Sequence, residues 1–515
     1  MKILISTFFL LIFFLAPLKN LGASLTVAIS SFPQSLKNPF FATDSNSQNI
    51  HRLTHLSLTD INENMRFSCR ICKSYKEKII ENKHKITFFI KKGVKFWDGD
   101  EIKAKDIKNS WKYFTEEKEI KSIFRFAFSK IKEINIIDKY TVELIYDQFS
   151  PDNISDLSLL KIVKIKDFGK KKFHVNDIIG AGPYKFLKTS DLSFVLSPVY
   201  DSSLSFLEFK TVKDETTLSL KLMNKEIDLS LIDFSPRKVK WLKKNKKKLG
   251  LKIWEKESSN YKYLSLNHKN KHLKDIKVRK SLSLILPRKD LLKYKLGDSA
   301  ILSNGLFSPA FVDNFLEGFI DSYNPELAKS LLLSTGYKKG KSGFFEKNGD
   351  VLHLRWRISN NKNTVELVKI IKDYYERFGI KVSLIINEWG TYYKAFKKGN
   401  FDLTLGQWIG FTGPEFFQSL FHSQSLPPIG RNRGRYNNPE MDRLISEAIE
   451  SHNFKKREKI FAEVQALANR DYAYINLWHP KILWVGRNCL DRVKIFPNGS
   501  FYPLLKIRDQ CTKEN

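Results

Sequence analysis

Histidine side chains are the first candidates for chemistry in this chain, because a neutral imidazole binds metal ions and exchanges protons near neutral pH. Among ten histidines, two pairs have the i, i+4 spacing that places both rings on one face of a helix: His51/His55 and His268/His272. Neither pair carries the intervening glutamate of a zinc-protease motif. We expect surface or cap positions for the first pair and an exposed, lysine-rich segment for the second.

Other catalytic motifs are also missing from the sequence. It contains no Gly-x-Ser-x-Gly nucleophile elbow and no phosphate-binding loop. The glycine cluster GAGPY at 180–184 is not followed by the Lys-Ser/Thr pair of a phosphate loop. Its glycines permit backbone angles that other residues resist, and its proline fixes the exit, so we expect a structural turn. The sequence therefore predicts a non-catalytic protein with no cofactor and no metal site.

The N-terminus has the composition of a secretory signal. Lys2 precedes an apolar run that ends at Leu18, and a signal peptidase could cut after Ala23. The run is shorter than the roughly 20 apolar residues of a membrane-spanning helix. No cysteine lies near the cut, which argues against a lipoprotein. We expect an exported, soluble chain of 515 − 23 = 492 residues, long enough for two or three domains.

Four cysteines form two pairs in the sequence, Cys69/Cys72 and Cys489/Cys511. Disulfides are the default in an oxidising compartment. Cys489 and Cys511 lie on either side of a predicted strand return, so we expect a disulfide between them. Cys69-x-x-Cys72 follows a polar turn, whereas a redox pair usually opens a helix after a strand. For this pair, a small local disulfide and two free thiols are both favoured over redox chemistry.

The formal charge of +33 comes from 88 lysine and arginine residues against 55 acidic ones. Strongly basic surfaces bind nucleic acid through its phosphates. Here the lysines are spread along the chain, and the densest runs, at 170–172 and 243–248, suit solvated faces or loops. No zinc-finger or RNA-binding signature accompanies them. We predict no nucleic-acid partner, although a basic surface suits anionic lipid head groups or acidic ligands.

The stretch 86–114, ITFFIKKGVKFWDGDEIKAKDIKNSWKYF, gives the clearest local structure. It predicts a strand over 87–90, a turn at Gly93 and a tight turn at Asp98-Gly99, because aspartate and glycine tolerate turn conformations. An amphipathic helix follows, with Ile107 and Phe114 on its apolar face.

The second half of the chain contains strong helix starts. The NPE triplets at 324–326 and 438–440 each combine a capping side chain, a proline in the first turn and an acid that suits the helix dipole. Residues 365–378 predict another amphipathic helix, which Gly379 ends before an alternating strand over 382–386. This helix–glycine–strand order indicates α/β units.

Motifs in order from about residue 25 to about residue 485 resemble those of family 5 extracellular solute-binding proteins. The resemblance implies a periplasmic-binding-protein-like α/β fold of two lobes joined by a hinge, with an additional subdomain inserted in lobe I. Ligand would bind in the cleft between the lobes and shift an open–closed equilibrium. The motifs are the 86–114 stretch, GAGPY at 180–184, EID at 226–228, YLSLN at 263–267, DIKVRKSL at 275–282 and YNNPEMD at 436–442.

The resemblance also suggests how the chain divides into domains. We predict that residues 24–50, 178–263 and 480–515 form lobe I. Residues 51–177 would form the inserted subdomain, and residues 264–479 would form lobe II.

The resemblance further implies which residues contact ligand. The segment after residues 401–402 lines the cleft in the family and places Trp408 at its tryptophan position, where a rigid ring stacks on peptide without demanding one sequence. Peptide-binding members usually carry an aspartate about three residues later for the ligand's α-ammonium. Phe411 has that spacing here, so this charge-assisted bond is lost unless Glu415 or another acid replaces it. The predicted contacts are Phe32, Tyr261, Tyr263, Trp408, Phe411 and Glu415.

These expectations describe a monomeric periplasmic component of an ABC importer that delivers peptide or a peptide-like solute to an inner-membrane permease. The missing aspartate and the basic charge leave open a non-peptide solute, such as a metal chelate, a blocked peptide or an anionic oligomer. A surface or structural protein that has lost transport is a further alternative, as is an exported enzyme built on this fold.

Overall fold

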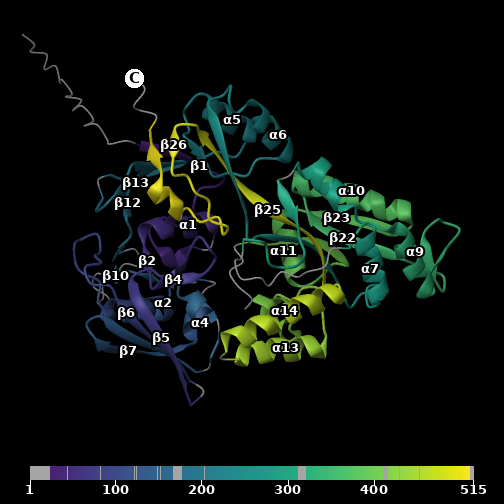
Figure 1. The fold of residues 1–515 in the computed structure, drawn as a ribbon, viewed down its shortest axis with the longest axis horizontal. Helices are drawn as coiled ribbons and strands as arrows, with labels where there is room; N and C mark the ends of the chain where they lie inside the picture. The colour runs from purple at the N-terminus through teal and green to yellow at the C-terminus, as the bar shows by residue number, and fades with distance from the viewer. Residues whose placement is uncertain are drawn as a thin grey trace, which may run out of the picture.

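One long strand, β25 (Tyr474–Arg487), runs through both halves of the molecule (Figure 1). Its first part pairs with β17 (Tyr261–Leu266) and β18 (Ala300–Leu302), and its last part pairs with β15 (Leu229–Ser230) and β16 (Leu251–Glu257). The two halves therefore share one continuous strand, which connects the two lobes.

A computed structural model describes residues 24–42, 44–81, 83–120, 122, 125–147, 149–150, 152–165, 177–201, 203–297, 299–310, 321–409, 416–427, 430–451 and 453–510. The predicted signal segment and the lysine run at 170–172 lie outside these residues. None of the described helices is both long and apolar enough to cross a membrane.

The largest sheet in the described part of the chain is mixed and has twelve strands. β1 and β22 each run parallel to both of their neighbours, whereas the other pairs are antiparallel. Helices cover the faces of the parallel regions, which gives the predicted α/β architecture. Along its main path the spatial order is β12 (Tyr184–Thr189), β13 (Ser193–Pro198), β14 (Phe206–Thr211), β1 (Ser24–Ile29), β15, β25, β17, β24 (Leu403–Trp408), β22 (His353–Ser359) and β23 (Lys381–Asn387).

Lobe I has an apolar core on each face of β1. Leu25 and Val27 pack on one face together with α1 (Ser45–Thr54). Ala28 packs on the other face, which α5 (Glu215–Met223) and α6 (Pro236–Asn245) cover. Because α1 packs on one face of β1 and α5 and α6 pack on the other, both of its faces are buried by the lobe.

The inserted subdomain has a separate core between a four-stranded sheet and α2 (Ala104–Glu116). The predicted turns before α2 are confirmed, since Gly93 and Gly99 have φ values of +79° and +92°. Ile107 and Phe114 are buried in this core, as predicted. The strands in spatial order are β5 (Cys72–Ile80), β6 (Lys83–Ile90), β8 (Thr141–Tyr146) and β7 (Ile131–Asp138).

Close packing, rather than backbone angle, explains the glycines at 180–184. Neither Gly180 nor Gly182 has a positive φ. A Cβ on Gly182 would lie 2.3 Å from the carbonyl carbon of Thr54, and one on Gly180 would lie 2.5 Å from the Trp97 ring. The Trp97 indole N–H donates to the Gly182 carbonyl at 3.0 Å. The structural interpretation of this cluster is confirmed, but its physical reason is contact with α1 and Trp97.

Lobe II contains both helices that the NPE triplets predict. Asn324 caps α9 (Pro325–Ser334), and Asn438 caps α13 (Pro439–Glu450), each through a 2.9 Å bond from a backbone N–H. Helix α10 (Lys362–Phe378) ends at Gly379 and leads into β23, as predicted. Other helices of lobe II are α7 (Ile276–Leu284), α11 (Trp389–Lys397), the short α12 (Phe416–Phe421) and α14 (Phe454–Arg470).

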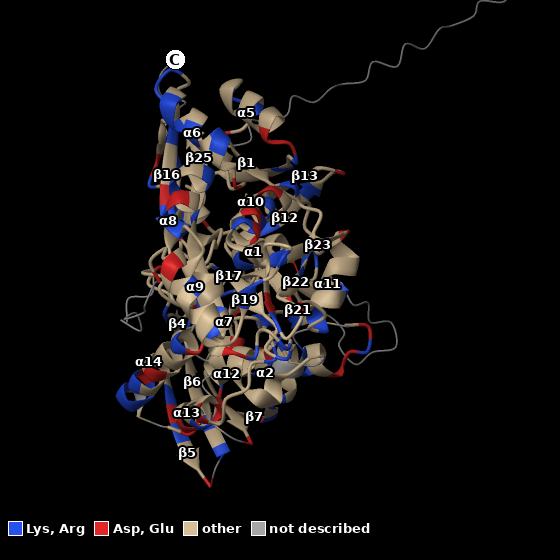
Figure 2. Cartoon of the chain, turned by 90° about the vertical axis from the view of Figure 1, so that its right-hand side faces the viewer, with Lys and Arg blue, Asp and Glu red and all other residues tan. Residues whose placement is uncertain are grey.

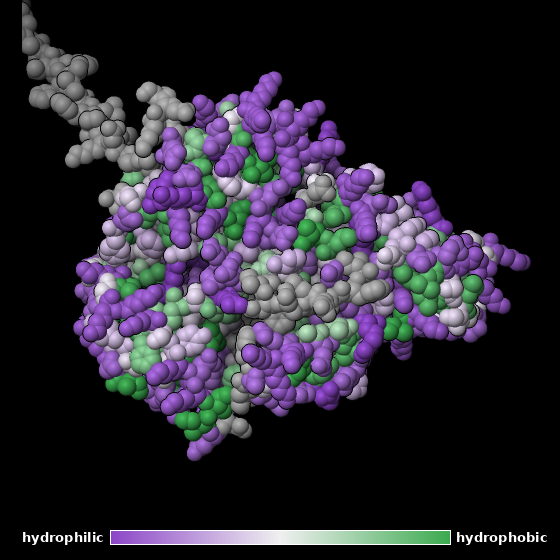
Figure 3. Space-filling model, viewed as in Figure 1, coloured by the Kyte–Doolittle hydropathy of each residue, from purple (hydrophilic) through white to green (hydrophobic). Residues whose placement is uncertain are grey.

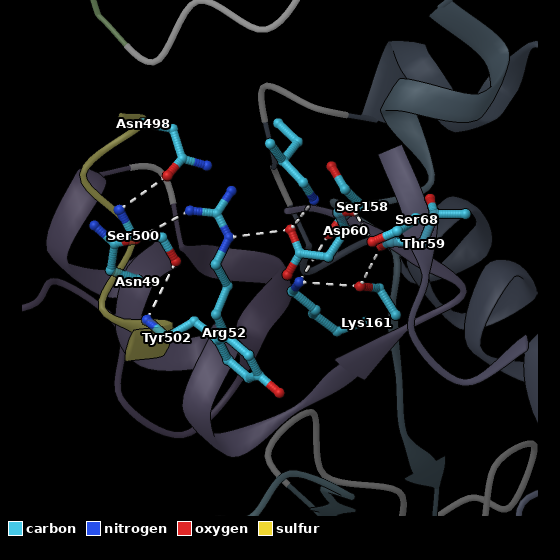
Figure 4. A network of polar contacts seen from close by, with 12 residues as sticks. Asn49, Arg52, Thr59, Asp60, Ser68, Ser158, Lys161, Asn498, Ser500 and Tyr502 are labelled. Carbon is cyan, nitrogen blue, oxygen red and sulfur yellow. Dashed lines mark hydrogen bonds and ion pairs between the residues drawn. The ribbon is translucent and has the colours of Figure 1, made fainter. Parts of the chain in front are cut away.

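A buried charge network joins lobe I to the inserted subdomain (Figure 4). Arg52 on α1 places Nε 3.5 Å from Oδ1 of Asp60 on β3 (Thr59–Ile61). Lys161 on β9 (Lys161–Ile162) donates from Nζ to the Ser158 carbonyl at 2.7 Å. Burial raises the pKa of Asp60, but the positive charges of Arg52, Lys161 and Arg70 lower it by more, so its pKa lies below the ordinary value. Burial lowers the pKa of Lys161 to about 8, and nearby Asp60 opposes that shift.

Two of the predicted domain boundaries fall inside regular elements. Residue 50 lies within α1, whose Ile50 and Leu53 pack in the lobe I core. Residue 263 lies within β17, which pairs with β24 of lobe II. We therefore propose boundaries after α1 and before β17, at points where the backbone leaves a packed element.

Lysine and arginine residues are spread over both lobes and the inserted subdomain (Figure 2). The run at 243–248 occupies the end of α6 and the turn that follows, and Lys244 and residues 246–248 are exposed, as predicted for a solvated face. The face drawn in Figure 3 is mostly hydrophilic, with apolar residues in small separate groups.

Candidate ligand-binding site

An open cleft of about 720 Å³ lies between the two lobes. Lobe I contributes the first residues of α5 and α6, and lobe II contributes the first turn of α10. Trp478 and Pro480 of β25 line it between these two sides. The volume falls within the range of about 300–1,000 Å³ that is typical of sites for small organic ligands.

Strand pairing decides which side chains of β17 and β24 reach this cleft. Successive side chains of a strand point to opposite faces. Lys262 and Gln407 are paired across the two strands and share one face, with Lys262 Nζ 3.4 Å from Gln407 Oε1. Leu405 lies two residues before Gln407 on that face and adds apolar surface. The cleft therefore combines an apolar wall with a central lysine.

Acidic side chains in the cleft are mostly engaged by the protein itself. Asp233 is the exception, because it has no ion pair and no hydrogen bond within the described ranges. Its backbone lies just before α6, so the carboxylate belongs to the lobe I side. The engaged acids are Asp214 with the Thr217 N–H (2.7 Å), Glu215 with the Ser235 N–H (3.0 Å) and Glu366 with Lys295 Nζ (2.7 Å).

The cleft shifts the pKa values of two charged side chains. The Asp233 side chain is exposed to the cleft, yet protein atoms surround it, and the resulting loss of water raises its pKa to about 6. Lys262 is half-buried, and the same effect lowers its pKa to about 8. Both shifts reflect a charge that water no longer stabilises fully. A bound group of opposite charge would therefore stabilise the charged form of either side chain.

The predicted aromatic contacts lie on the opposite face of the same two strands. Tyr261, Tyr263 and Trp408 are 1%, 2% and 9% exposed. The Tyr263 ring centroid lies 5.2 Å from that of Tyr261 and 6.2 Å from that of Trp408, with nearly parallel planes in both pairs. Gly406 makes room for this stack, since a Cβ there would lie 2.3 Å from the Tyr263 ring. Trp408 is therefore buried in this structure, and contact between this cluster and ligand stays a prediction.

The remaining predicted contacts do not line this cleft or are not described. Phe32 is half-buried in lobe I, where its ring meets that of Phe194 edge-on at 5.7 Å. Phe411 and Glu415 lie outside the described residues. The role of these three side chains therefore stays a prediction.

Both histidine pairs contain buried packing residues. His51 and His55 are each 1% exposed, so the predicted surface position is wrong, although His55 is the C-cap residue of α1. His272 is 4% exposed, with Nδ1 2.7 Å from the Tyr337 hydroxyl, so its predicted exposure is also wrong. Within the described ranges no three or more side chains gather in a way that would hold a metal ion.

Cys69 and Cys72 form a disulfide where β4 (Phe67–Cys69) meets β5. This finding decides between the local disulfide and the two free thiols. Cys511 lies outside the described residues, so its pairing with Cys489 stays a prediction.

Comparison with known proteins assigns the chain to a family. The family model described as bacterial extracellular solute-binding proteins, family 5 (middle), matches residues 70–426. The chain belongs to this family. The resemblance to this family and the predicted two-lobed α/β fold are thus confirmed. The family's description places its members outside the cell.

Individual relatives of this family 5 protein are similar over nearly its whole length. It is 25% identical to the oligopeptide-binding protein AppA of Bacillus subtilis, over 94% of this chain and 91% of the relative. Solved structures with the same fold include NikZ of Campylobacter jejuni in complex with Ni(L-His), with 24% identity, a TM-score of 0.73, and 92% and 95% of the two chains covered. NikA of Brucella suis in complex with Fe(III)-EDTA has 18% identity, a TM-score of 0.81, and 94% and 100% coverage. These relatives are named for binding or solved with bound ligand.

Sequence reasoning did not single out three side chains of this family 5 protein: Lys262 and Asp233, which line the cleft, and Trp389, which lies on the surface. Lys262 is the only charged residue of the strand Tyr261–Leu266, and alternation places it on the same face as Leu264. A lysine on an otherwise apolar strand face could have pointed to this position. Asp233 carried no local signal, because its loop position before α6 looks like ordinary polar sequence. Trp389 on α11 is 59% exposed and stacks on Tyr393 at 5.6 Å, which marks an open aromatic surface that the sequence did not distinguish from core.

Proposed function

We propose that this protein is the substrate-binding component of an ABC importer and binds peptide or a peptide-like solute in the cleft between its lobes. The observation that carries the proposal is the cleft itself. Both lobes line it, and it offers apolar side chains together with unpaired charges from each side. A peptide needs this combination, because its backbone and termini are polar whereas many of its side chains are apolar.

Closure of the cleft would couple binding to delivery. The lobes share β25, so a change in the backbone near Pro480 alters the angle between them without unfolding either core. A ligand that contacts α6 on one side and α10 on the other binds the closed form better than the open form. Such differential affinity shifts the equilibrium toward the closed form, which a permease can then recognise.

The proposal also covers export, oligomeric state and the partner that receives the solute. The chain would be exported through cleavage after residue 23, remain in the periplasm as a monomer without a lipid anchor, and deliver its solute to an inner-membrane ABC permease. The name of the AppA relative supports an oligopeptide as the solute class.

Calorimetry and small-angle scattering test this proposal together. The chain from residue 24 onward, freed of co-purified ligand, is titrated with a set of di- to pentapeptides and with a nickel–histidine chelate. We expect micromolar or tighter binding of some peptides, with a smaller radius of gyration when peptide is bound. If the chelate binds and no peptide does, the solute is a non-peptide ligand and the peptide proposal is wrong. Binding of neither, with an unchanged scattering profile, would contradict a role in solute capture.

A further inference from the structure

We propose that the cleft selects ligands of net negative charge, so that the preferred peptides carry more carboxylates than ammonium groups. This inference rests on the proposed function and names the solute class of the same cleft. It begins from the charges that the protein leaves unpaired there.

The cationic side chains that line the cleft outnumber the acidic ones by five to four. Four of them, Lys213, Arg237, Lys262 and Lys362, form no ion pair among the described residues, and all four line the cleft. Lys295 is already paired with Glu366. On the anionic side, Asp214, Glu215 and Asp233 form no ion pair among the described residues; Asp214 and Glu215 accept hydrogen bonds from neutral groups, which leave their negative charge in place. Outside the Lys295–Glu366 pair, the cleft thus presents four cations and three anions among the described residues, an excess of one positive charge.

Helix orientation adds to this positive potential. The first residues of α5, α6 and α10 all line the cleft. The N-terminus of a helix carries a partial positive charge, worth about 0.3–1 kcal/mol toward a nearby anion. The carboxylates of Asp214 and Glu215 already lie at the starts of α5 and α6, whereas α10 is capped by the neutral Asn361. The N-terminus of α10 is therefore the one of these three ends that adds to the cations without a carboxylate of the protein bound at its cap.

Lys262 occupies the position where an anion would gain most. It is half-buried on a central strand, and its ammonium has one weak neutral partner, Gln407 Oε1 at 3.4 Å. Desolvation already lowers its pKa to about 8. A ligand carboxylate beside it would restore the lost stabilisation and raise that pKa. Charge-assisted bonds of this kind are roughly twice as strong as neutral ones.

Asp233 gives the cleft one place for a positive group. Its carboxylate faces the same cleft from lobe I, without a partner among the described residues, and can accept from the ammonium of a peptide N-terminus. The arrangement suits a ligand with one ammonium and several carboxylates, such as a free peptide rich in glutamate or aspartate.

Three matched tetrapeptides test the selection by charge: Ala-Glu-Glu-Ala, Ala-Gln-Gln-Ala and Ala-Lys-Lys-Ala. By calorimetry with the ligand-free mature chain, we expect the Glu peptide to bind at least tenfold more tightly than the Lys peptide. The difference should shrink as salt rises from 20 to 300 mM, because ions screen exposed charges. Lys262→Gln and Lys362→Gln should each weaken the Glu peptide by at least fivefold, while Lys329→Gln on exposed α9 should not.

Proton uptake gives a second readout that a purely structural role of Lys262 would not move. At pH 8 about half of the Lys262 side chains are neutral, so binding of the Glu peptide should take up about half a proton more in the wild type than in Lys262→Gln. Titrations in buffers of different ionisation enthalpy measure this number. N-acetylation of the Glu peptide should weaken its binding to the wild type and have little effect on Asp233→Asn.

The outcomes separate this inference from the proposed function. If the three tetrapeptides bind equally and Lys262→Gln changes neither affinity nor proton uptake, the inference is wrong and peptide binding stands. If the Lys peptide binds best, the inference is also wrong. If no peptide binds, the proposed function fails and the inference fails with it.

Discussion

Replacing Asp60 by asparagine should lower the free energy of unfolding by about 2–3 kcal/mol at pH 7. Asp60 is the acid between Arg52 and the buried Lys161 in the network that joins lobe I to the inserted subdomain (Figure 4). Breaking a fully buried ion pair costs about 3–5 kcal/mol. The cost is smaller here because Arg52 keeps some contact with water and a bond to Asn49, and Lys161 keeps its bond to the Ser158 carbonyl.

The pH dependence of this loss identifies its cause. The folded-state pKa of Lys161 is about 8, below its ordinary 10.5, and without Asp60 it would be lower still. Because its pKa is lower in the folded state, Lys161 binds fewer protons in the folded state than in the unfolded state. The free energy of unfolding therefore rises with pH between the folded-state pKa and the unfolded-state pKa. In the variant this rise begins at lower pH. The difference between wild type and variant should therefore shrink from pH 7 to pH 9.

Urea unfolding followed by fluorescence measures both effects. Asp191→Asn, in an exposed hairpin, is the matched control and should change stability by less than 0.5 kcal/mol. A loss below 0.5 kcal/mol for Asp60→Asn would show that the network does not stabilise the interface. A loss that stays constant from pH 7 to pH 9 would show that it does not arise from the buried lysine.

Three further perturbations test the fold. Gly182→Ala should destabilise by about 1–3 kcal/mol in urea unfolding, because its Cβ would lie 2.3 Å from backbone atoms of α1, and a neutral outcome would contradict that packing. Replacing Cys69 and Cys72 by serine should cost about 2 kcal/mol relative to the disulfide-bonded wild type, from the entropy of a four-residue loop, and the reduced wild type should match the variant. Burial lowers the pKa values of His51 and His479 to about 3 and about 4. The unfolded state then binds more protons as pH falls below 6.5, so stability should drop by about 2 kcal/mol per histidine by pH 5; equal stability at pH 7.5 and 5 would contradict their burial.

Local signals predicted the elements whose ends are set by a single residue. Asn324 and Asn438 cap helices α9 and α13, and Gly379 ends α10, because capping and positive φ are properties of a few neighbouring residues. Motif order then supplied the family and the two-lobed fold. These parts of the structure depend on sequence over short distances.

Contacts between distant segments could not be predicted in the same way. His51 and His272 look like ordinary polar residues of their segments, but both are buried, and their ring nitrogens contact the Ser35 carbonyl and the Tyr337 hydroxyl of other segments. The alternation of β17 predicted that Tyr261 and Tyr263 share a face, and it could not say that the cleft lies on the face of Lys262. Which face meets the other lobe is decided by the packing of β24 and β25 on either side of this strand.

Identification of the natural ligand tests the central claim most directly. The protein is purified from its native host without denaturation, the ligand is released with acid, and the small molecules are identified by mass spectrometry. We expect short peptides enriched in glutamate and aspartate. A set of cationic peptides, or a single species that contains no peptide bond, would contradict the account of an acidic-peptide cleft.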